Sequence, residues 1–334
     1  MPPLSPPPSL PRLVIYHQTH HYDDGTPRSV LPLITQPNIS VTHVIIAAIH
    51  LHNPPENIKL PSHSRNRTLW AEVRKLQYIG IKILGMLGGA AKGSFARLDR
   101  DEASFELYYK PLQDFIKEKN LDGLDLDVEE EISLSSIIRL IDRLKADFGE
   151  DFLITLAPVA TALIFEEPKY NLSGFSYEAL DVMRGNKIAW YNTQFYCGWG
   201  DMSNTNAFDQ IIAHGYNANK IVIGLITNPK NGSGWVSPDV LQGVLIKLKI
   251  KYPNFGGIMG WEYFNSLPGG SEAPWEWAAN MTRYIRSDLA TDSAQIYAML
   301  RSFEQSANSK VDSHLENEAP KPNSFEYISD NDEV

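Results

Sequence analysis

The chain has 334 residues, of which 43% are hydrophobic and 21% charged, as in ordinary globular proteins with a large core. Its formal net charge of -10 at pH 7 argues against nucleic acid or an anionic membrane as a partner. No apolar run reaches the roughly 18 residues of a transmembrane helix, and Cys197, the only cysteine, excludes an internal disulfide bond.

Both ends of the chain differ in composition from its middle. Residues 1–10 are rich in proline and lack the basic and apolar segments of a signal peptide, so we expect an N-terminal arm. Residues 291–334 are polar and acidic, and we expect a C-terminal helix and tail there. We expect a secreted protein whose signal peptide is absent from the sequence as given. Five N-x-S/T sequons favour this reading: Asn38, Asn66, Asn171, Asn231 and Asn280.

The middle of the chain alternates short β-rich runs with helix-length amphipathic segments. Eight runs are predicted as strands: residues 12–18, 42–50, 82–87, 123–128, 152–158, 187–196, 220–226 and 257–263. Helices are predicted between them, among others at 68–78, 102–117, 134–147, 239–251 and 275–287. Eight such units favour an α/β fold, a (β/α)8 barrel in a single catalytic domain at 11–290. A doubly wound open sheet is the alternative, but it requires a glycine-rich loop after the first strand, and "YHQTHHYDDG" is not one.

The predicted fourth strand carries carboxylates at every second position, in "LDGLDLDVEEE" (residues 121–131). Side chains alternate across a strand, so Asp125, Asp127 and Glu129 point to one face, the barrel interior. Burying three carboxylates together requires shared protons or hydrogen bonds. Glu129 falls at the strand's C-terminal end, which opens onto the active site in such barrels. Because it lies beside another carboxylate, we expect its pKa to be raised, which suits it to proton donation. A cation site is the alternative, and Glu130 and Glu131 are expected to begin a solvated loop.

The motif Asp122-Gly-Leu-Asp-Leu-Asp-Val-Glu129 resembles the D-G-x-D-x-D-x-E signature of glycoside hydrolase family 18, which contains chitinases and endo-β-N-acetylglucosaminidases. The resemblance covers roughly residues 10–290. "YNTQFY" at 191–196 resembles the family's Q-x-Y element, and "GGIMGWEYFNS" at 256–266 resembles its last strand with a floor tryptophan. "GMLGG" at 85–89 resembles its S-x-G-G but has no serine in place. The nearest likeness is to the secreted fungal endo-β-N-acetylglucosaminidases of the Trichoderma type.

The resemblance implies a retaining hydrolase in which the 2-acetamido group of the substrate is the nucleophile. Glu129 is then the general acid and base, Asp127 binds the acetamido N–H, and Asp125 supports Asp127. Tyr196 and Gln194 bind and orient the same sugar. Further substrate-binding candidates are Trp261, Tyr16, Gly88, Gly89, Asn192, Trp199, Trp235 and Glu262.

The expected substrate is the GlcNAc–GlcNAc core of Asn-linked glycans. About 30 residues between the last two strands leave no room for the α+β domain that walls many bacterial-type chitinase grooves, and the resulting open cleft suits a bulky branched glycan as well as plant-type chitinases. Chitin or chitooligosaccharide is the alternative substrate, and a catalytically silent sugar-binding protein is a further alternative. We expect a monomer with no cofactor and no metal. His20, His21, His50 and His52 follow the first two strands and are interpreted as loop or glycan-contact residues rather than metal ligands.

Overall fold

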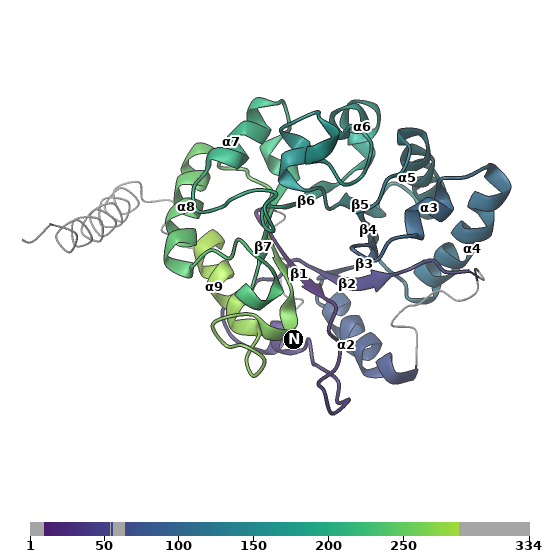
Figure 1. Cartoon of the computed structure of the whole chain (residues 1–334). Coiled ribbons are helices and arrows are strands. Elements are labelled where there is room, and N and C mark those ends of the chain that lie inside the picture. Colours follow the sequence, from purple (N-terminus) through teal and green to yellow (C-terminus); the bar gives the residue numbers. More distant parts are fainter. Residues whose placement is uncertain (1–9, 54, 56–63, 287–334) are drawn as a thin grey trace, which may run out of the picture. The chain divides into compact units, whose positions relative to one another are not determined.

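A computed structural model describes residues 10–53, 55 and 64–286. The predicted C-terminal helix and tail at 291–334, and nearly all of the predicted N-terminal arm, lie outside these residues. Within the described part, eight parallel strands pair in chain order and close into a barrel, with the first strand bonded to the last. Figure 1 shows the strands at the centre of a ring of helices. The predicted (β/α)8 barrel is therefore confirmed.

The strands are short and almost wholly buried, as expected for a parallel sheet that is covered on both faces. They are β1 (Arg12–His17), β2 (His43–Ile49), β3 (Lys82–Gly88), β4 (Gly123–Asp127), β5 (Leu153–Leu156), β6 (Trp190–Gln194), β7 (Ile221–Ile226) and β8 (Gly257–Trp261). One apolar cluster fills the barrel and a larger one fills the layer between strands and helices.

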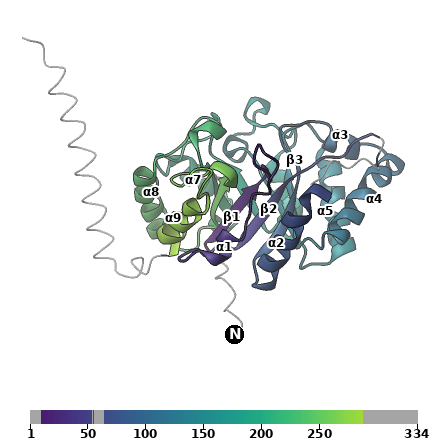
Figure 2. The same ribbon diagram turned by 90° about the horizontal axis from the view of Figure 1, so that it is seen from below.

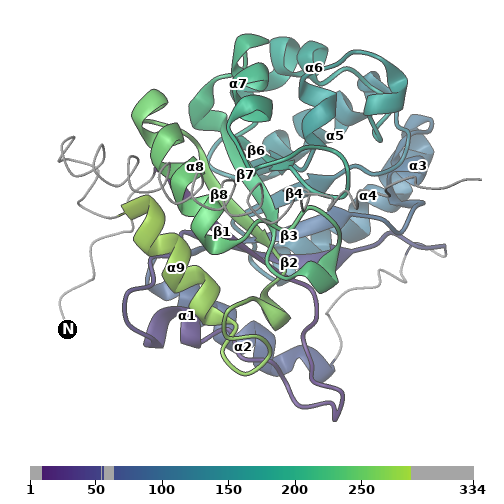
Figure 3. The ribbon, with the colours of Figure 1, turned by 60° about the vertical axis from the view of Figure 1, so that its left-hand side comes forward.

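The helices cover the outer face of the barrel, and the longer ones pack on it through an apolar stripe. They are α1 (Pro32–Thr35), α2 (Arg67–Tyr78), α3 (Ser94–Leu98), α4 (Glu102–Glu118), α5 (Leu134–Phe148), α6 (Tyr177–Arg184), α7 (Asn206–Ala213), α8 (Pro238–Lys251) and α9 (Trp275–Arg286). Asp101 caps α4 by accepting from the Ser104 N–H at 3.0 Å. Helices α8 and α9 lie side by side in Figures 2 and 3. Within the described residues, no helix is both long and apolar enough to cross a membrane.

Two differences from the predicted elements affect the site. The predicted sixth strand at 187–196 ends at Gln194 and the predicted fourth at Asp127, so Tyr196 and Glu129 lie just beyond their strands, at the C-terminal end of the barrel.

The segment between β7 and β8 is described throughout and contains the 3-10 helix η6 (Pro229–Asn231) and α8, with no inserted domain. The cleft therefore has no α+β wall on that side.

Candidate active site

Three carboxylates follow β4 toward the C-terminal mouth of the barrel. Asp125 is fully buried, Asp127 is 5% exposed, and Glu129 is half-buried two residues beyond the strand. Their positions follow from the alternation of the strand, which turns Leu124, Leu126 and Val128 outward into the layer under the helices. The sequence pattern therefore brings the three acids together on one interior face, as predicted.

Asp125, the deepest acid, is surrounded by hydrogen-bond donors. The Tyr16 hydroxyl donates to it at 2.7 Å, the Thr155 hydroxyl at 2.5 Å and the Asn192 amide at 3.0 Å. Burial raises the pKa of Asp125, and these three donors oppose the rise because they stabilise the ionised form. Asp125 is thus a buried acid whose negative charge is well solvated by the protein.

Asp127 and Glu129 share one donor, the side-chain amide of Gln194. Its Nε2 lies 3.2 Å from Asp127 Oδ1, 3.4 Å from Glu129 Oε1 and 3.0 Å from the Ala157 carbonyl oxygen. Burial, followed by the charges of Glu129 and Asp125, raises the pKa of Asp127 well above its usual value. Burial also raises the pKa of Glu129, and the hydrogen bond from Gln194 opposes that rise.

These environments separate the three acids by their protonation. Asp125 has three donors that favour its anion, whereas Asp127 has one neutral donor and two acidic neighbours. These environments favour the anion of Asp125 and the protonated form of Asp127. Glu129 lies at the mouth, where a bound molecule could reach it, and burial raises its pKa.

A cleft of about 800 Å³ opens above these acids. Asp127, Glu129, Gln194 and Tyr196 line it, and the half-buried ring of Trp261 meets the Tyr16 ring edge-on at a centroid distance of 5.6 Å. Burial raises the pKa of Tyr196 well above its usual value, so its hydroxyl stays a hydrogen-bond donor. Trp199 lines the same cleft, as do Gly88 and Gly89 and the histidines at 20, 21 and 50.

Four residues predicted to bind substrate lie elsewhere. Tyr16 and Asn192 are below the cleft and donate to Asp125. Glu262 is 4% exposed, because its carboxylate accepts from the backbone N–H groups of Gln18 and Thr19. It ties the end of β8 to the loop after β1. Trp235 packs against the cluster inside the barrel and lines a separate hollow of about 20 Å³ beside α8 and α9.

Two glycines at the end of β3 permit a close approach to β4. Gly88 has φ +97°, and a Cβ there would lie 2.4 Å from both the Asp127 carbonyl oxygen and the Phe95 ring. Gly89, at φ +88°, donates its N–H to the Asp127 carbonyl oxygen at 2.8 Å. A side chain at residue 88 is therefore excluded both by space and by backbone conformation.

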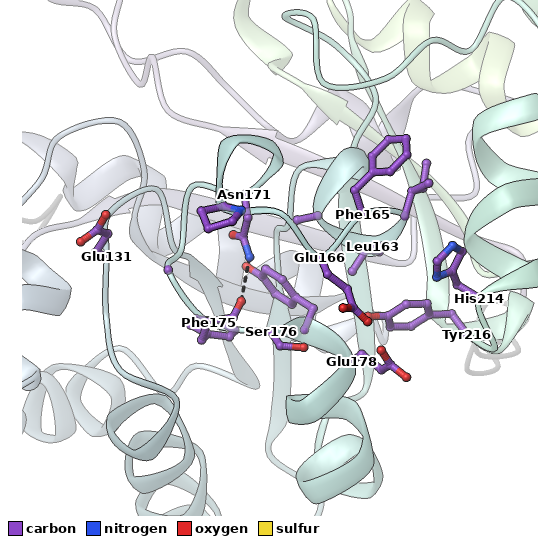
Figure 4. Close-up of a pocket in the computed structure, with 15 residues that line it drawn as sticks. Glu131, Leu163, Phe165, Glu166, Asn171, Phe175, Ser176, Glu178, His214 and Tyr216 are labelled. Carbon is purple, nitrogen blue, oxygen red and sulfur yellow. Dashed lines mark hydrogen bonds between the residues drawn. The ribbon is translucent and has the colours of Figure 1, made fainter.

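A second hollow, of about 150 Å³, lies apart from the acids, among residues that follow β5 and α7 (Figure 4). Phe165 and Tyr216 contribute rings to it, and Asn171 donates to the Phe175 carbonyl oxygen at 2.7 Å. Glu131 stands at its edge. Among the described residues, no group of three or more His, Cys, Asp or Glu side chains is placed to hold a metal ion.

The prediction from sequence missed two contributors and misjudged a third. Thr155, opposite Asp125 in the register of β4 and β5, was detectable as a hydroxyl within a buried strand. Asn231 lines the cleft and donates to the Trp261 carbonyl oxygen at 3.2 Å. The expectation of a solvated Glu130 is wrong: it is 7% exposed and accepts from two backbone N–H groups.

Comparison with known proteins gives a consistent picture. A fungal endo-β-N-acetylglucosaminidase of family 18 has a structure with TM-score 0.81 and 48% identity, in a match that covers 84% of this chain and all of the other. Chitinase ChiC of Aspergillus fumigatus has TM-score 0.74 and 52% identity, covering 81% and 98%. Chitinase 2 of Rhizopus oligosporus is 26% identical over 211 residues, and the match spans 58% of this chain and only 36% of that relative.

The sequence model described as "Glycosyl hydrolases family 18" matches residues 12–318, which is most of the chain. That match agrees with the closed barrel and with the acids at its mouth. The chain belongs to glycosyl hydrolase family 18 and is a glycoside hydrolase.

Proposed function

We propose that the enzyme is an endo-β-N-acetylglucosaminidase that hydrolyses the β-1,4 bond of the GlcNAc–GlcNAc core of Asn-linked glycans. The observation that carries the chemistry is the row of acids Asp125, Asp127 and Glu129 under an open cleft, with Gln194 bridging the last two. The substrate class is supported by the 48% identical endo-β-N-acetylglucosaminidase, whose whole length this chain matches.

The reaction is retaining and uses the acetamido oxygen of the substrate as the nucleophile. Glu129 protonates the glycosidic oxygen as the acetamido oxygen attacks the anomeric carbon and the glycosidic bond breaks, and it later takes a proton from the incoming water. Asp127 accepts a hydrogen bond from the acetamido N–H and offsets the positive charge of the oxazolinium ion. Its raised pKa fits this task, because a ligand N–H must replace the proton that the resting carboxyl holds.

The remaining residues orient the sugar at the cleavage site. Tyr196 donates its hydroxyl to the acetamido oxygen, and Gln194 holds Asp127 and Glu129 in mutual register. Trp261 supplies an apolar ring face under the sugar. Asp125 takes no direct part: its three donors keep it ionised, so the proton that Asp127 gives up passes to Glu129, the general acid.

Chitin is the second candidate substrate, and the 52% identity to a chitinase favours it. The cleavage site is compatible with both the glycan core and chitin, since both present a 2-acetamido sugar. The absence of a domain between β7 and β8 leaves room for a branched glycan, because a bulky substrate needs a cleft that is not walled on that side.

Mass spectrometry of the protein after incubation with denatured N-glycoproteins, and separately with chitohexaose, distinguishes the candidates. Glycoprotein that keeps a single GlcNAc on asparagine is the expected result. Cleaved chitohexaose beside untouched glycoprotein would establish a chitinase instead. Tight sugar binding without any product from either substrate would indicate a catalytically silent binding protein.

We further propose that the enzyme is fungal, secreted and monomeric. The fungal source of similar proteins and the five sequons support the first two points. Asn38, in an exposed turn with φ 63°, is the sequon best placed to carry a glycan, whereas Asn66 is 8% exposed. Size-exclusion chromatography with light scattering tests the monomer.

A further inference from the structure

Glu130 follows the proposed acid Glu129 directly and has a different environment. Its side chain is buried, and its two oxygens accept from two backbone N–H groups where the loop after β3 enters α3, Gly93 at 2.7 Å and Phe95 at 2.8 Å. Each oxygen serves one donor. Glu130 therefore fastens the end of β4 to a loop 35 or more residues earlier in the chain.

The same loop is fastened to β4 on the other side of Glu129. Gly89 donates its N–H to the Asp127 carbonyl oxygen at 2.8 Å, and Phe95 packs where a side chain at residue 88 would otherwise lie. From the loop after β5, the Ser173 hydroxyl donates to the Val128 carbonyl oxygen at 2.6 Å. Residues 127, 128 and 130 are thus each fixed by a partner from a neighbouring loop.

Glu129 itself has much weaker support. The contact that holds its carboxylate is the 3.4 Å hydrogen bond from Gln194. Its position therefore depends mainly on the backbone on either side of it. On the C-terminal side that backbone is held first through Glu130 and then by the Ile132 N–H, which donates to the Ser173 carbonyl oxygen at 3.0 Å. A general acid must stand within hydrogen-bond reach of the leaving oxygen, and a displacement of about 1 Å can cost about 100-fold in rate.

We propose that Glu130 is a positioning residue, which holds the general acid Glu129 in place by anchoring its backbone to the loop after β3. The proposal rests on the proposed acid role of Glu129. Glu130 is not among the described residues that line the cleft, and both of its carboxylate oxygens accept from backbone donors away from it. A misplaced general acid slows the cleavage of bonds whose leaving group must be protonated more than the cleavage of other bonds. A general loss of structure slows both equally.

The test compares two substrates with the same glycone, one joined to GlcNAc and one to 4-nitrophenol. The sugar oxygen of the natural bond is strongly basic and must be protonated to leave, whereas 4-nitrophenolate is a weak base and leaves with little help from the acid. We expect Glu130→Ala to lower kcat by about 10- to 100-fold on the natural bond and by less than about 3-fold on the aryl glycoside. KM stays within about 3-fold on both, because the acetamido-binding groups are intact.

Glu130→Gln is the conservative variant, and Glu131→Gln is the matched control. The glutamine amide keeps one acceptor oxygen but places its NH2 against the other backbone donor. We therefore expect its ratio of kcat on the natural bond to kcat on the aryl glycoside to fall between those of wild type and Glu130→Ala. Glu131 is exposed at the edge of the second hollow, with its carboxylate away from the other labelled side chains (Figure 4), and its variant behaves as wild type.

The ratio of the two rates does not depend on how much of a variant is folded, because both substrates are assayed on one preparation. Equal losses on both substrates, or a Glu130→Ala enzyme within about twofold of wild type on the natural bond, would overturn the proposal for Glu130. If the wild-type protein cleaves neither substrate, the proposed function fails first, so the two failures are distinguishable.

Discussion

Replacing Glu129 with glutamine removes the proposed acid while keeping its shape. Loss of a general acid typically costs 10²- to 10⁴-fold, or about 2.7 to 5.4 kcal/mol of barrier. We expect the upper half of that range. Among the described residues that line the cleft, the only other carboxyl is Asp127, which is 5% exposed and lies below Glu129. No second acid is therefore placed to substitute for it.

The same substitution is expected to leave the fold at least as stable as wild type. Burial raises the pKa of Glu129 in the folded state, so folding disfavours its charge at neutral pH, and glutamine carries none. The contact with Gln194 survives, since an amide oxygen accepts the same hydrogen bond. Thermal unfolding at pH 7 should therefore give a Tm that is not lower than that of wild type.

The assay is release of glycan from a purified glycopeptide, followed by chromatography, with wild type and Glu131→Gln as references. Glu131 lies two positions after Glu129 and is exposed, so Glu131→Gln controls for the loss of a carboxylate in this segment. Turnover of Glu129→Gln within about tenfold of wild type, in a folded protein, would refute the acid assignment.

Asp127→Asn should gain stability relative to wild type as the pH rises above about 4, because the native carboxyl, whose pKa is raised, retains a proton that the unfolded carboxyl loses near pH 3.9. The Asp127 carboxyl stabilises wild type fully below that pH, and this contribution is lost as the pH rises through the raised folded pKa. If the Tm of Asp127→Asn minus that of wild type fell as the pH rose, this reasoning would be contradicted. Gln194→Leu should move the alkaline limb of kcat/KM to higher pH, since Gln194 lowers the pKa of Glu129, and an unchanged or lowered limb would argue against that contact. Gly88→Ala should lower the free energy of unfolding by about 1–3 kcal/mol through its clash with Asp127 and Phe95, and a wild-type denaturant midpoint would show that the loop relaxes freely.

The acids could be predicted because their arrangement is local. Asp125, Asp127 and Glu129 follow from the two-residue period of one strand, and Gln194 and Tyr196 follow from the same period near the end of another. The barrel followed from eight alternating units. Short helices such as α1 and α3, with four and five residues, fall below the length at which a periodic pattern can be recognised.

The errors concern residues whose partners are distant in the chain. Glu130 looks like the start of a solvated loop, and only the pairing of β3 with β4 brings the N–H groups of Gly93 and Phe95 to it. Glu262 meets the loop after β1 across more than 240 residues. Trp235 follows a strand as sugar-stacking residues do, but its direction depends on how the segment before α8 packs. Local patterns contain none of this information.

The most direct test of the proposed reaction is a proton NMR time course of the enzyme acting on a glycopeptide with a single Asn-linked glycan. We predict that the peptide keeps one GlcNAc and that the new reducing-end GlcNAc of the released glycan appears first as the β-anomer, before mutarotation. A first-formed α-anomer would contradict the acetamido-assisted retaining route through Asp127 and Glu129. A peptide that carries no GlcNAc would contradict the proposed site of cleavage.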